Sequence, residues 1–396
     1  MDGEKCVPRL RFPEFVDSWQ QRKLSECAGF RRGSFPQPYG NKEWYDGDGA
    51  MPFVQVADVA DDMKLVDNTK QKISKIAQPM SVYADKGSVI VTLQGSIGRV
   101  AVTQYDAFVD RTVLLFYKYN QDIDKTFWAY IVKKVFVEKA KQAPGGTIKT
   151  ITKEVLSDFE VMIPSFEEQK KLAAFCDNLE TFINLYQRKV SCIKEFKSGV
   201  LQKMFPRDGE SVPEIRFPGF TEDWEQRKVQ DIYKITRGYV LAAPETVETA
   251  SDEMPYPVFS SQTKNNGLMG YYKDYLYENA ITWTTDGANA GTVNYRAGKF
   301  YCTNVCGVLL SDGGYSNKCA AEALNNVAWK WVSHVGNPKL MNNVMGEIPI
   351  TLPKSIEEQN QISEIFEQID NLITLHRRKL EKMMEYKRGL FQQMFV

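Results

Sequence analysis

Residues 7–15 of the chain read Val-Pro-Arg-Leu-Arg-Phe-Pro-Glu-Phe, and residues 212–220 repeat them as Val-Pro-Glu-Ile-Arg-Phe-Pro-Gly-Phe. The stretch that follows each copy also matches, as Trp-Gln-Gln-Arg-Lys from Trp19 and Trp-Glu-Gln-Arg-Lys from Trp224. Solenoid repeats are only ~20–50 residues long, far shorter than the distance between these copies. We therefore predict a duplicated domain, with a separate hydrophobic core in each copy and pseudo-two-fold symmetry.

A second pair of blocks closes each half of the sequence. Ile-Pro-Ser-Phe-Glu-Glu-Gln at 163–169 is echoed by Leu-Pro-Lys-Ser-Ile-Glu-Glu-Gln at 352–359, and the match continues to the Met-Phe pairs at 204–205 and 394–395. Between the blocks, residues 24–162 and 229–351 share only scattered glycine and aromatic positions. Matching blocks at the ends of each half, with diverged stretches between them, favour two domains that recognise different targets.

The composition is that of an ordinary globular protein. The chain has 396 residues, of which 43% are hydrophobic and 25% charged, so we expect two or three domains. It has no apolar run of membrane-spanning length and no signal-peptide pattern at its N-terminus, so we expect a cytoplasmic location and no membrane association. Its seven scattered cysteines suit reduced thiols better than a disulfide framework.

The net charge is zero, with 50 basic and 50 acidic residues. Proteins that coat nucleic acid non-specifically are usually strongly basic, because neutralising phosphates releases counterions and supplies their affinity. A DNA-binding function would therefore need local basic surfaces or basic partners.

The two closing segments show heptad spacing that predicts long coiled-coil helices, antiparallel to each other. One line of the predicted seam is formed by Leu172, Leu179, Tyr186, Ile193 and Val200, and by Ile362, Ile369, His376, Met383 and Leu390. The other line is formed by Phe175, Phe182 and Phe196, and by Ile365, Leu372 and Tyr386. His376 replaces Tyr186, so we interpret it as a packing residue.

The apolar face of each predicted helix is wider than a two-stranded coiled coil requires. We therefore predict that a partner docks on them. The candidate docking residues are Phe175, Phe182, Ile183, Ile365, Leu372 and Ile373.

The diverged stretches combine short β-type runs with helical segments. Expected strands include 88–93, 113–118, 280–284 and 307–310, and expected helices are 125–141 and 319–335. The prediction is a mixed α/β chain of the α+β class, with two pseudo-symmetric globular domains linked by two long antiparallel coiled-coil helices. The expected boundaries are 1–163 and 207–352 for the domains, and 164–206 and 353–396 for the helices.

Taken together, the repeated Arg-Phe-Pro-x-Phe and Trp openings, the Glu-Glu-Gln helix starts and the Gly-x-x-x-x-Met-Phe endings resemble the specificity (S) subunit of type I restriction–modification enzymes. The resemblance covers the whole chain. It implies two target-recognition domains, each recognising one half of a split sequence in double-stranded DNA. It also implies helices that set the spacing and dock two modification (M) subunits, which carry S-adenosylmethionine and methylate an adenine in each half-site. Restriction (R) subunits with ATP/Mg-driven translocation and nuclease activity would complete the complex.

Motifs for independent catalysis are missing from the sequence. The string nearest to an Asn/Asp-Pro-Pro-aromatic methyltransferase motif is Asn337-Pro338-Lys339, which lacks the second proline and the aromatic residue. No Walker A motif occurs. We expect a non-catalytic subunit with no catalytic residues, metal or cofactor of its own. Two alternatives stay open: a stand-alone DNA methyltransferase or nuclease with a degenerate motif, and a coiled-coil adaptor without DNA contacts.

Recognition of DNA would then fall to loop side chains, because Arg and Lys pair with guanine, Asn and Gln pair with adenine, and smaller polar groups hold phosphates. The first domain offers Arg31, Arg32, Gln55, Lys70, Lys72, Gln94, Ser96, Arg99, Thr147 and Lys149. The second offers Arg237, Tyr239, Ser261, Gln262, Lys264, Asn265, Asn266, Asn289, Arg296, Asn337 and Lys339. The foremost candidate is the run 260–267, because its uniformly polar or small residues suit a recognition loop better than a core.

Overall fold

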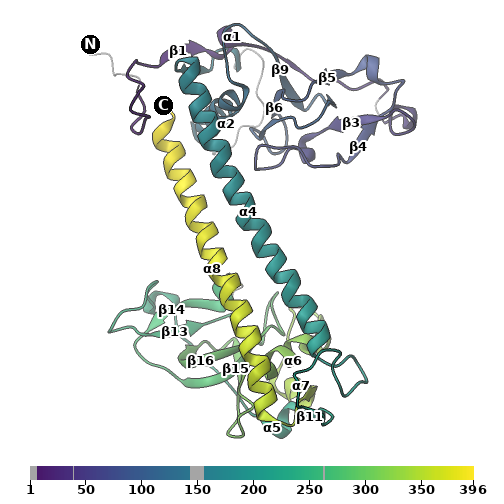
Figure 1. Ribbon diagram of the computed structural model, residues 1–396, viewed down its shortest axis with the longest axis vertical. Helices are drawn as coiled ribbons and strands as arrows, with labels where there is room; N and C mark the ends of the chain where they lie inside the picture. The colour runs from purple at the N-terminus through teal and green to yellow at the C-terminus, as the bar shows by residue number, and fades with distance from the viewer. Residues whose placement is uncertain (1–6, 39, 143–155, 262–263) are drawn as a thin grey trace. The chain divides into compact units, whose positions relative to one another are not determined.

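The computed structural model describes residues 7–38, 40–142, 156–261 and 264–396 (Figure 1). The chain divides into two compact units. The first unit comprises Met1–Leu185 and Leu380–Val396, and the second comprises Tyr186–Lys379. Among the described residues, no helix is both long and apolar enough to cross a membrane.

In its described residues, the first unit contains three small sheets. Its strands are β1 (Gln20–Lys23), β2 (Ala28–Arg32), β3 (Met51–Val54), β4 (Gln71–Ile73), β5 (Val82–Ala84), β6 (Val89–Thr92), β7 (Val100–Val102), β8 (Ala107–Val109), β9 (Val113–Tyr119) and β10 (Glu160–Ile163). Its helices are α1 (Leu24–Cys27) and α2 (Lys125–Gln142). The strands pair in the orders β2-β9-β6-β7, β4-β3-β8-β5 and β1-β10. The largest core of the unit includes Phe127 and Trp128 of α2, which are fully buried.

The second unit is built around one six-stranded sheet. Its strands are β11 (Glu225–Lys228), β12 (Lys234–Arg237), β13 (Tyr256–Phe259), β14 (Leu268–Tyr272), β15 (Tyr277–Thr284), β16 (Val293–Cys302), β17 (Cys306–Leu310) and β18 (Pro349–Leu352). Its short helices are α5 (Val229–Ile232), α6 (Lys318–Ala328) and α7 (Asn342–Glu347). The sheet order is β12-β17-β15-β16-β13-β14, and β11 pairs with β18. Trp283 and Leu309 pack with α6 in the core.

Helix α6 is shorter than the sequence predicted. Asn317 caps its start, because the side-chain oxygen accepts a hydrogen bond from the Ala320 amide at 2.9 Å. The helix ends at Ala328, and Trp329–Trp331 continue as a 3-10 turn. Such tightening is common at helix ends. The predicted helix 319–335 therefore stops well before Val335.

Glycines at corresponding places show that the two units share a backbone plan. A Cβ atom on Gly33 would lie 2.2 Å from the Val109 carbonyl oxygen, and one on Gly238 would lie 2.1 Å from the Cys302 carbonyl oxygen. Only glycine permits such an approach. Each glycine directly follows an exposed arginine at the end of a strand, Arg32 on β2 and Arg237 on β12.

The repeated sequence blocks form the same buried contact in both units. In the first unit, Arg11 donates two hydrogen bonds of 2.7 Å to the Glu168 carboxylate, and the Trp19 indole donates a third at 3.2 Å. In the second unit, Arg216 donates to the Glu358 carboxylate at 2.7 and 2.9 Å, and the Trp224 indole donates at 3.3 Å.

The Met-Phe pairs that end the repeated blocks complete this contact. The Phe395 ring packs edge-on against Trp19 in the first unit, and Phe205 does the same against Trp224 in the second. The sequence repeats are therefore the residues that attach each domain to its helices.

Two long helices complete the molecule, α4 (Phe166–Met204) and α8 (Ile356–Met394), each of 39 residues (Figure 1). At ~1.5 Å per residue, each is roughly 58 Å long. They pack antiparallel within each unit. In the first, Glu180 pairs with Lys387. In the second, Tyr186 lies 5.8 Å from His376 between ring centroids, and Lys197 pairs with Asp370 at 2.8 Å.

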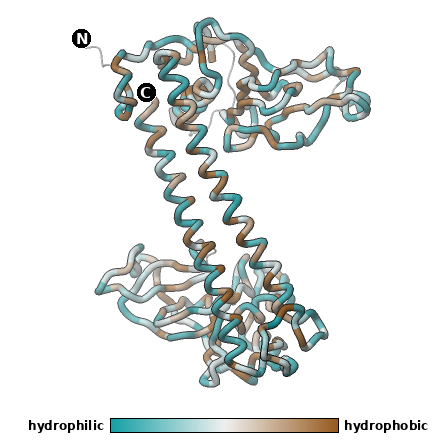
Figure 2. The backbone as a smooth tube through the Cα atoms, in the orientation of Figure 1, coloured by the Kyte–Doolittle hydropathy of each residue, from teal (hydrophilic) through white to brown (hydrophobic). Residues whose placement is uncertain are grey.

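The structure corrects the predicted register of the seam. Phe182, Phe196, Leu372 and Tyr386 are exposed by 55%, 62%, 47% and 67%. The buried second line instead comprises Cys176, Ile183 and Val190 in α4 and Phe366 and Ile373 in α8. These residues follow the first line by four positions rather than three, so Phe182, Phe196, Leu372 and Tyr386 lie outside the seam. Figure 2 shows hydrophobic positions recurring along both helices.

Candidate nucleic-acid interface

In the second unit, hydrogen bonds connect several loops that carry predicted DNA-binding residues. The Asn289 side chain donates to the Ser261 carbonyl oxygen at 2.9 Å. The Asp286 carboxylate accepts a hydrogen bond from Asn337 and lies 3.8 Å from the Lys339 ammonium. The structure therefore brings the loops at 260–267, 285–291 and 333–340 together.

The 260–267 loop ends in a turn of unusual backbone shape. Asn265, Asn266 and Gly267 have φ angles of 50°, 54° and 88°. Asparagine and glycine tolerate this left-handed region better than other residues. The Ser260 amide closes the loop by donating to the Gly267 carbonyl oxygen at 2.8 Å. Asn265 and Asn266 are exposed, whereas Gln262 and the side chain of Lys264 lie outside the described part of the chain.

Arg237 and Tyr239 flank the buried Gly238 at the end of β12. Tyr239 is 63% exposed, and the Arg237 guanidinium lies 3.4 Å from the side-chain oxygen of Asn342. Arg296 differs from the other candidates because it is only 9% exposed. Burial lowers its pKa to about 10. The sequence predicts it among the loop side chains, but it lies within the strand β16.

In the first unit, a buried aspartate organises several candidates. The Asp58 carboxylate accepts hydrogen bonds from the backbone amides of Gln55 at 2.8 Å and Lys70 at 2.9 Å. Arg99 pairs with Asp61 at 3.0 Å and donates to the Val59 carbonyl oxygen at 3.3 Å. Gln55, Lys70 and Arg99 therefore gather around the segment 55–61.

The other described candidates of the first unit lie on strands or turns. Gln94 and Ser96 are exposed in the turn between β6 and β7, and Lys72 is exposed on β4. The Arg31 guanidinium lies 5.9 Å from the centroid of the Tyr117 ring. Thr147 and Lys149 lie outside the described residues.

Two further exposed residues lie near the predicted candidates. Arg111 is exposed, and its guanidinium lies 4.6 Å from the centroid of the Phe35 ring, close in sequence to Gly33. Trp329 is 64% exposed, and its Cα atom approaches Gly291 beside the Asn289 loop. Arg111 could have been noticed as an arginine between two predicted strands. Trp329 was hidden by its assignment to an apolar helix.

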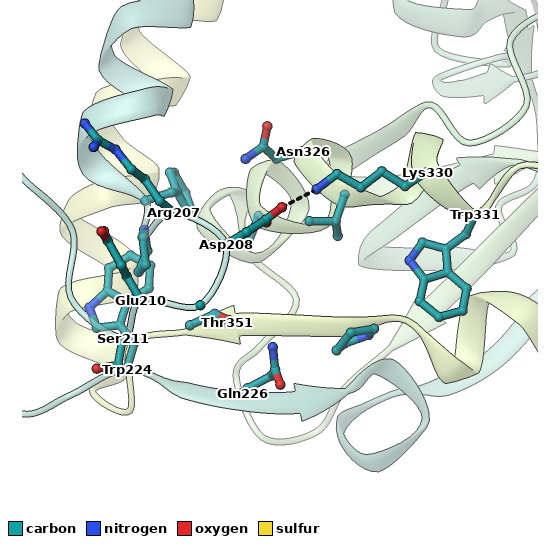
Figure 3. Close-up of a pocket in the computed structure, with 16 residues that line it drawn as sticks. Arg207, Asp208, Glu210, Ser211, Trp224, Gln226, Asn326, Lys330, Trp331 and Thr351 are labelled. Atoms are coloured by element: carbon teal, nitrogen blue, oxygen red, sulfur yellow. Dashed lines mark hydrogen bonds and ion pairs between the residues drawn. The ribbon is translucent and has the colours of Figure 1, made fainter.

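A pocket of about 510 Å³ lies in the second unit where α4 ends (Figure 3). The linker 206–211, α6 and the β11–β18 pair form its walls. Lys330 and Asp208 pair within it at 2.8 Å. None of the candidate DNA-binding residues of the described chain lines this pocket, so it belongs to the connection between the repeats.

The predicted docking residues fall into two groups. Phe182 and Leu372, which occupy corresponding positions in α4 and α8, are exposed. Ile183 and Ile373 are buried, and Phe175 and Ile365 are half-buried. Further exposed apolar residues also occur in corresponding pairs, Leu185 with Leu375 and Phe196 with Tyr386.

Comparison with known proteins places this architecture in one family. Residues 17–195 and 221–385 match the family described as the type I restriction modification DNA specificity domain. A type I specificity subunit of Mycoplasma pneumoniae is 31% identical over 54% of this chain and 86% of its own length. The MjaVIII specificity subunit of Methanocaldococcus jannaschii is 20% identical over 96% of this chain and 92% of its own.

A solved structure supports the fold. The type I restriction–modification S subunit from M. genitalium superposes with a TM-score of 0.69 at 15% identity, over 98% of this chain and 99% of that one. The chain belongs to the type I restriction–modification DNA specificity family and carries two copies of its specificity domain. Its function is DNA sequence recognition, and it is a non-catalytic subunit.

Proposed function

We propose that each unit recognises one half of a bipartite DNA target, and that the two long helices join the two recognition domains. One observation carries this proposal. The same Arg–Glu–Trp contact supports both units, through Glu168 and Glu358, while the loops they present differ. Two domains that recognise different half-sites require the same attachment to the helices but different loops.

Within each unit, the exposed arginine that precedes the closely packed glycine is a central candidate contact, Arg32 in the first and Arg237 in the second. Arginine is the side chain best suited to pair with guanine or to clamp phosphate. Asn265 and Asn266 add exposed amides that suit adenine. The neutral net charge implies that partner subunits contribute much of the non-specific phosphate affinity.

The long helices also offer two equivalent docking surfaces for modification subunits. We define them as Phe182, Leu185 and Tyr386 in the first unit, and Leu372, Leu375 and Phe196 in the second. Large exposed apolar side chains at corresponding positions favour partner contacts. Two such surfaces match two modification subunits, which would carry S-adenosylmethionine, with restriction subunits adding ATP-dependent activity. Because the DNA target is chromosomal or invading DNA, we infer that the complex acts in the cytoplasm.

The experiment is to express the chain with its modification subunit in a host without adenine methylation, and to map methylated adenines by sequencing. We expect one motif made of two specified half-sites separated by unspecified positions, with one methylated adenine in each. The modification subunit alone should give no motif. An undivided motif, or methylation that does not depend on this chain, would contradict the proposal.

A further inference from the structure

Arg296 of the second unit is a buried cation without an acidic partner in the described chain. It lies on β16 and is 9% exposed. Its guanidinium carbon is 3.7 Å from the centroid of the Phe259 ring, and its Nε atom donates to the Thr282 hydroxyl at 3.1 Å. Stacking on one face and a hydrogen bond at Nε fix the plane of the guanidinium.

The charge of Arg296 is not balanced by its neighbours. Desolvation lowers its pKa to about 10, and the titratable groups that act on it electrostatically are the Cys306 and Cys302 thiols. Burial raises the pKa of both thiols, that of Cys306 to about 11, so neither supplies a negative charge near neutral pH. An isolated buried charge is unfavourable unless a counter-charge or strong acceptor completes it.

The first unit shows which residues the same sheet carries without Arg296, because its strands pair in the same way. Ile90 of β6 pairs with Ala101 and Leu115, just as Thr282 of β15 pairs with Asn294 and Val308. In the first unit these positions form a purely apolar cluster. Arg296 lies two residues after Asn294, and the corresponding residue of the first unit, two after Ala101, is Thr103. The Thr103 hydroxyl donates to the Asp85 carbonyl oxygen at 2.7 Å. The shared frame therefore has no need of an arginine at the place that Arg296 occupies.

Arg296 also lies close to the candidate recognition loops. Its stacking partner Phe259 directly precedes Ser260, whose hydroxyl accepts a hydrogen bond from Thr303 at 3.0 Å. The next residue, Ser261, accepts from Asn289. With Nε occupied, the two terminal amino groups of the guanidinium are the donors that remain, and no acceptor for them occurs among the described residues. They form a fork that suits a pair of adjacent acceptors.

We propose that Arg296 is a DNA contact of the second unit, with its pre-oriented guanidinium fork taking a pair of acceptors from the target. This inference rests on the proposed function. The pair can be O6 and N7 of a guanine or two oxygens of one phosphate, since both present the same acceptor geometry. The first unit has no counterpart, so the contact contributes to recognition of one half-site only.

The test uses the full complex with its modification subunit and compares Arg296→Lys, Arg296→Met and the charge-matched control Lys299→Met, which alters an exposed residue of the same strand. DNA affinity is measured at several salt concentrations, and the methylated motif is mapped. A guanine contact predicts that one position of one half-site relaxes, with about a ten- to hundredfold loss on the cognate sequence. A phosphate contact predicts uniform weakening and a salt slope smaller by about one. The control should leave the motif unchanged.

Arg296→Lys keeps the charge but lacks the fork, so it decides the question if Arg296→Met does not fold. A folded Arg296→Lys complex with wild-type affinity, salt slope and motif would overturn the inference. That result would leave the proposed function intact, provided the wild-type complex still gives a bipartite motif. Absence of a bipartite motif in the wild type would instead contradict the proposed function itself.

Discussion

At the residue scale, Glu168 is the side chain on which the attachment of the first domain depends. Its side chain is 1% exposed and is the acceptor for both Arg11 and Trp19. Glu167 precedes it in the first turn of α4, where a carboxylate also interacts favourably with the helix dipole. The helix dipole would favour an acidic residue at either position, but the buried ion pair with Arg11 requires Glu168.

Replacing Glu168 by Gln should lower the stability of the first unit by about 3 kcal/mol, because Arg11 would keep a nearly buried charge without its counter-ion. Chemical denaturation followed by tryptophan fluorescence measures the change. The matched control is Asp158→Asn, which removes an exposed pair with Lys23 and should cost less than about 1 kcal/mol. Equal effects of the two substitutions would show that the buried contact is not the anchor.

The sequence identifies important residues of this protein better than it predicts their contacts and burial. The repeats contain Arg11, Trp19 and Glu168, but nothing in their spacing says that they meet, because the contact joins residues far apart in the chain. Arg296 was predicted as a loop contact, yet β16 extends from Val293 to Cys302 and its pleat turns Arg296 inward. Which face of a strand is buried depends on its partners, and these were not evident from the sequence.

At the element scale, the helices show which parts of a heptad pattern can be relied on. The first line of the predicted seam includes buried residues such as Leu172 and Ile369, and the helices begin at Phe166 and Ile356. The second line was wrong at Phe182 and Leu372, because apolar residues occur both three and four positions after residues of the first line. Spacings of three and of four both fit a helical face. Only the position of the partner helix distinguishes them.

The exposed aromatic and leucine side chains lead to a prediction about assembly. Replacing Phe182 and Leu372 together by Asp should abolish co-purification of modification subunits while the domains stay folded, because both side chains are about half exposed. Affinity pull-down and circular dichroism measure the two effects. Asn178→Asp with Asn371→Asp is the control, since it adds the same charge at exposed polar positions. Normal stoichiometry in the Phe182/Leu372 variant would rule out this docking surface.

His376 makes the helix pair sensitive to acid. It is 7% exposed, and burial together with the charges of Lys189 and Lys379 lowers its pKa below the ordinary value. The unfolded chain then binds a proton more readily than the folded chain, so stability is fully present above about pH 6.5 and falls as the pH drops below it. His376→Gln should reduce this dependence. Denaturation midpoints at pH 7.5 and 5.5 measure it, and identical shifts in both proteins would refute the assignment.

At the scale of the whole molecule, the fold class and the shared plan of the two units followed from the repeats, because similar blocks at matching places predict a duplicated domain. The candidate recognition residues could not be placed in the same way, because they lie in the diverged stretches, where loops meet through contacts such as Asn289 with Ser261. Recognition loops vary while the frame stays constant, so the residues most relevant to specificity carry the weakest sequence signal.

The lengths of the helices should set the spacing of the half-sites. Adding four residues to each helix, after Arg188 and after Arg378, would lengthen both by ~6 Å, close to two base pairs at ~3.4 Å each. We expect a methylated motif with unchanged half-sites and an unspecified spacer longer by one or two positions. Adding residues to one helix only should disrupt the antiparallel pair and reduce activity. Altered half-site bases with an unchanged spacer would contradict a spacing role.

The central claim, that each unit recognises its own half-site, is tested most directly by exchanging residues 24–162 for the matching stretch of a relative with a known motif. The exchange begins directly after β1 and ends within β10, and it leaves Arg11, Trp19 and Glu168 in place, so their attachment contact is retained. The methylated motif of the hybrid complex is then mapped by sequencing. We predict that one half-site becomes that of the relative while the other half-site and the spacer stay the same. A change in both half-sites, or in neither with a folded and active complex, would contradict the account.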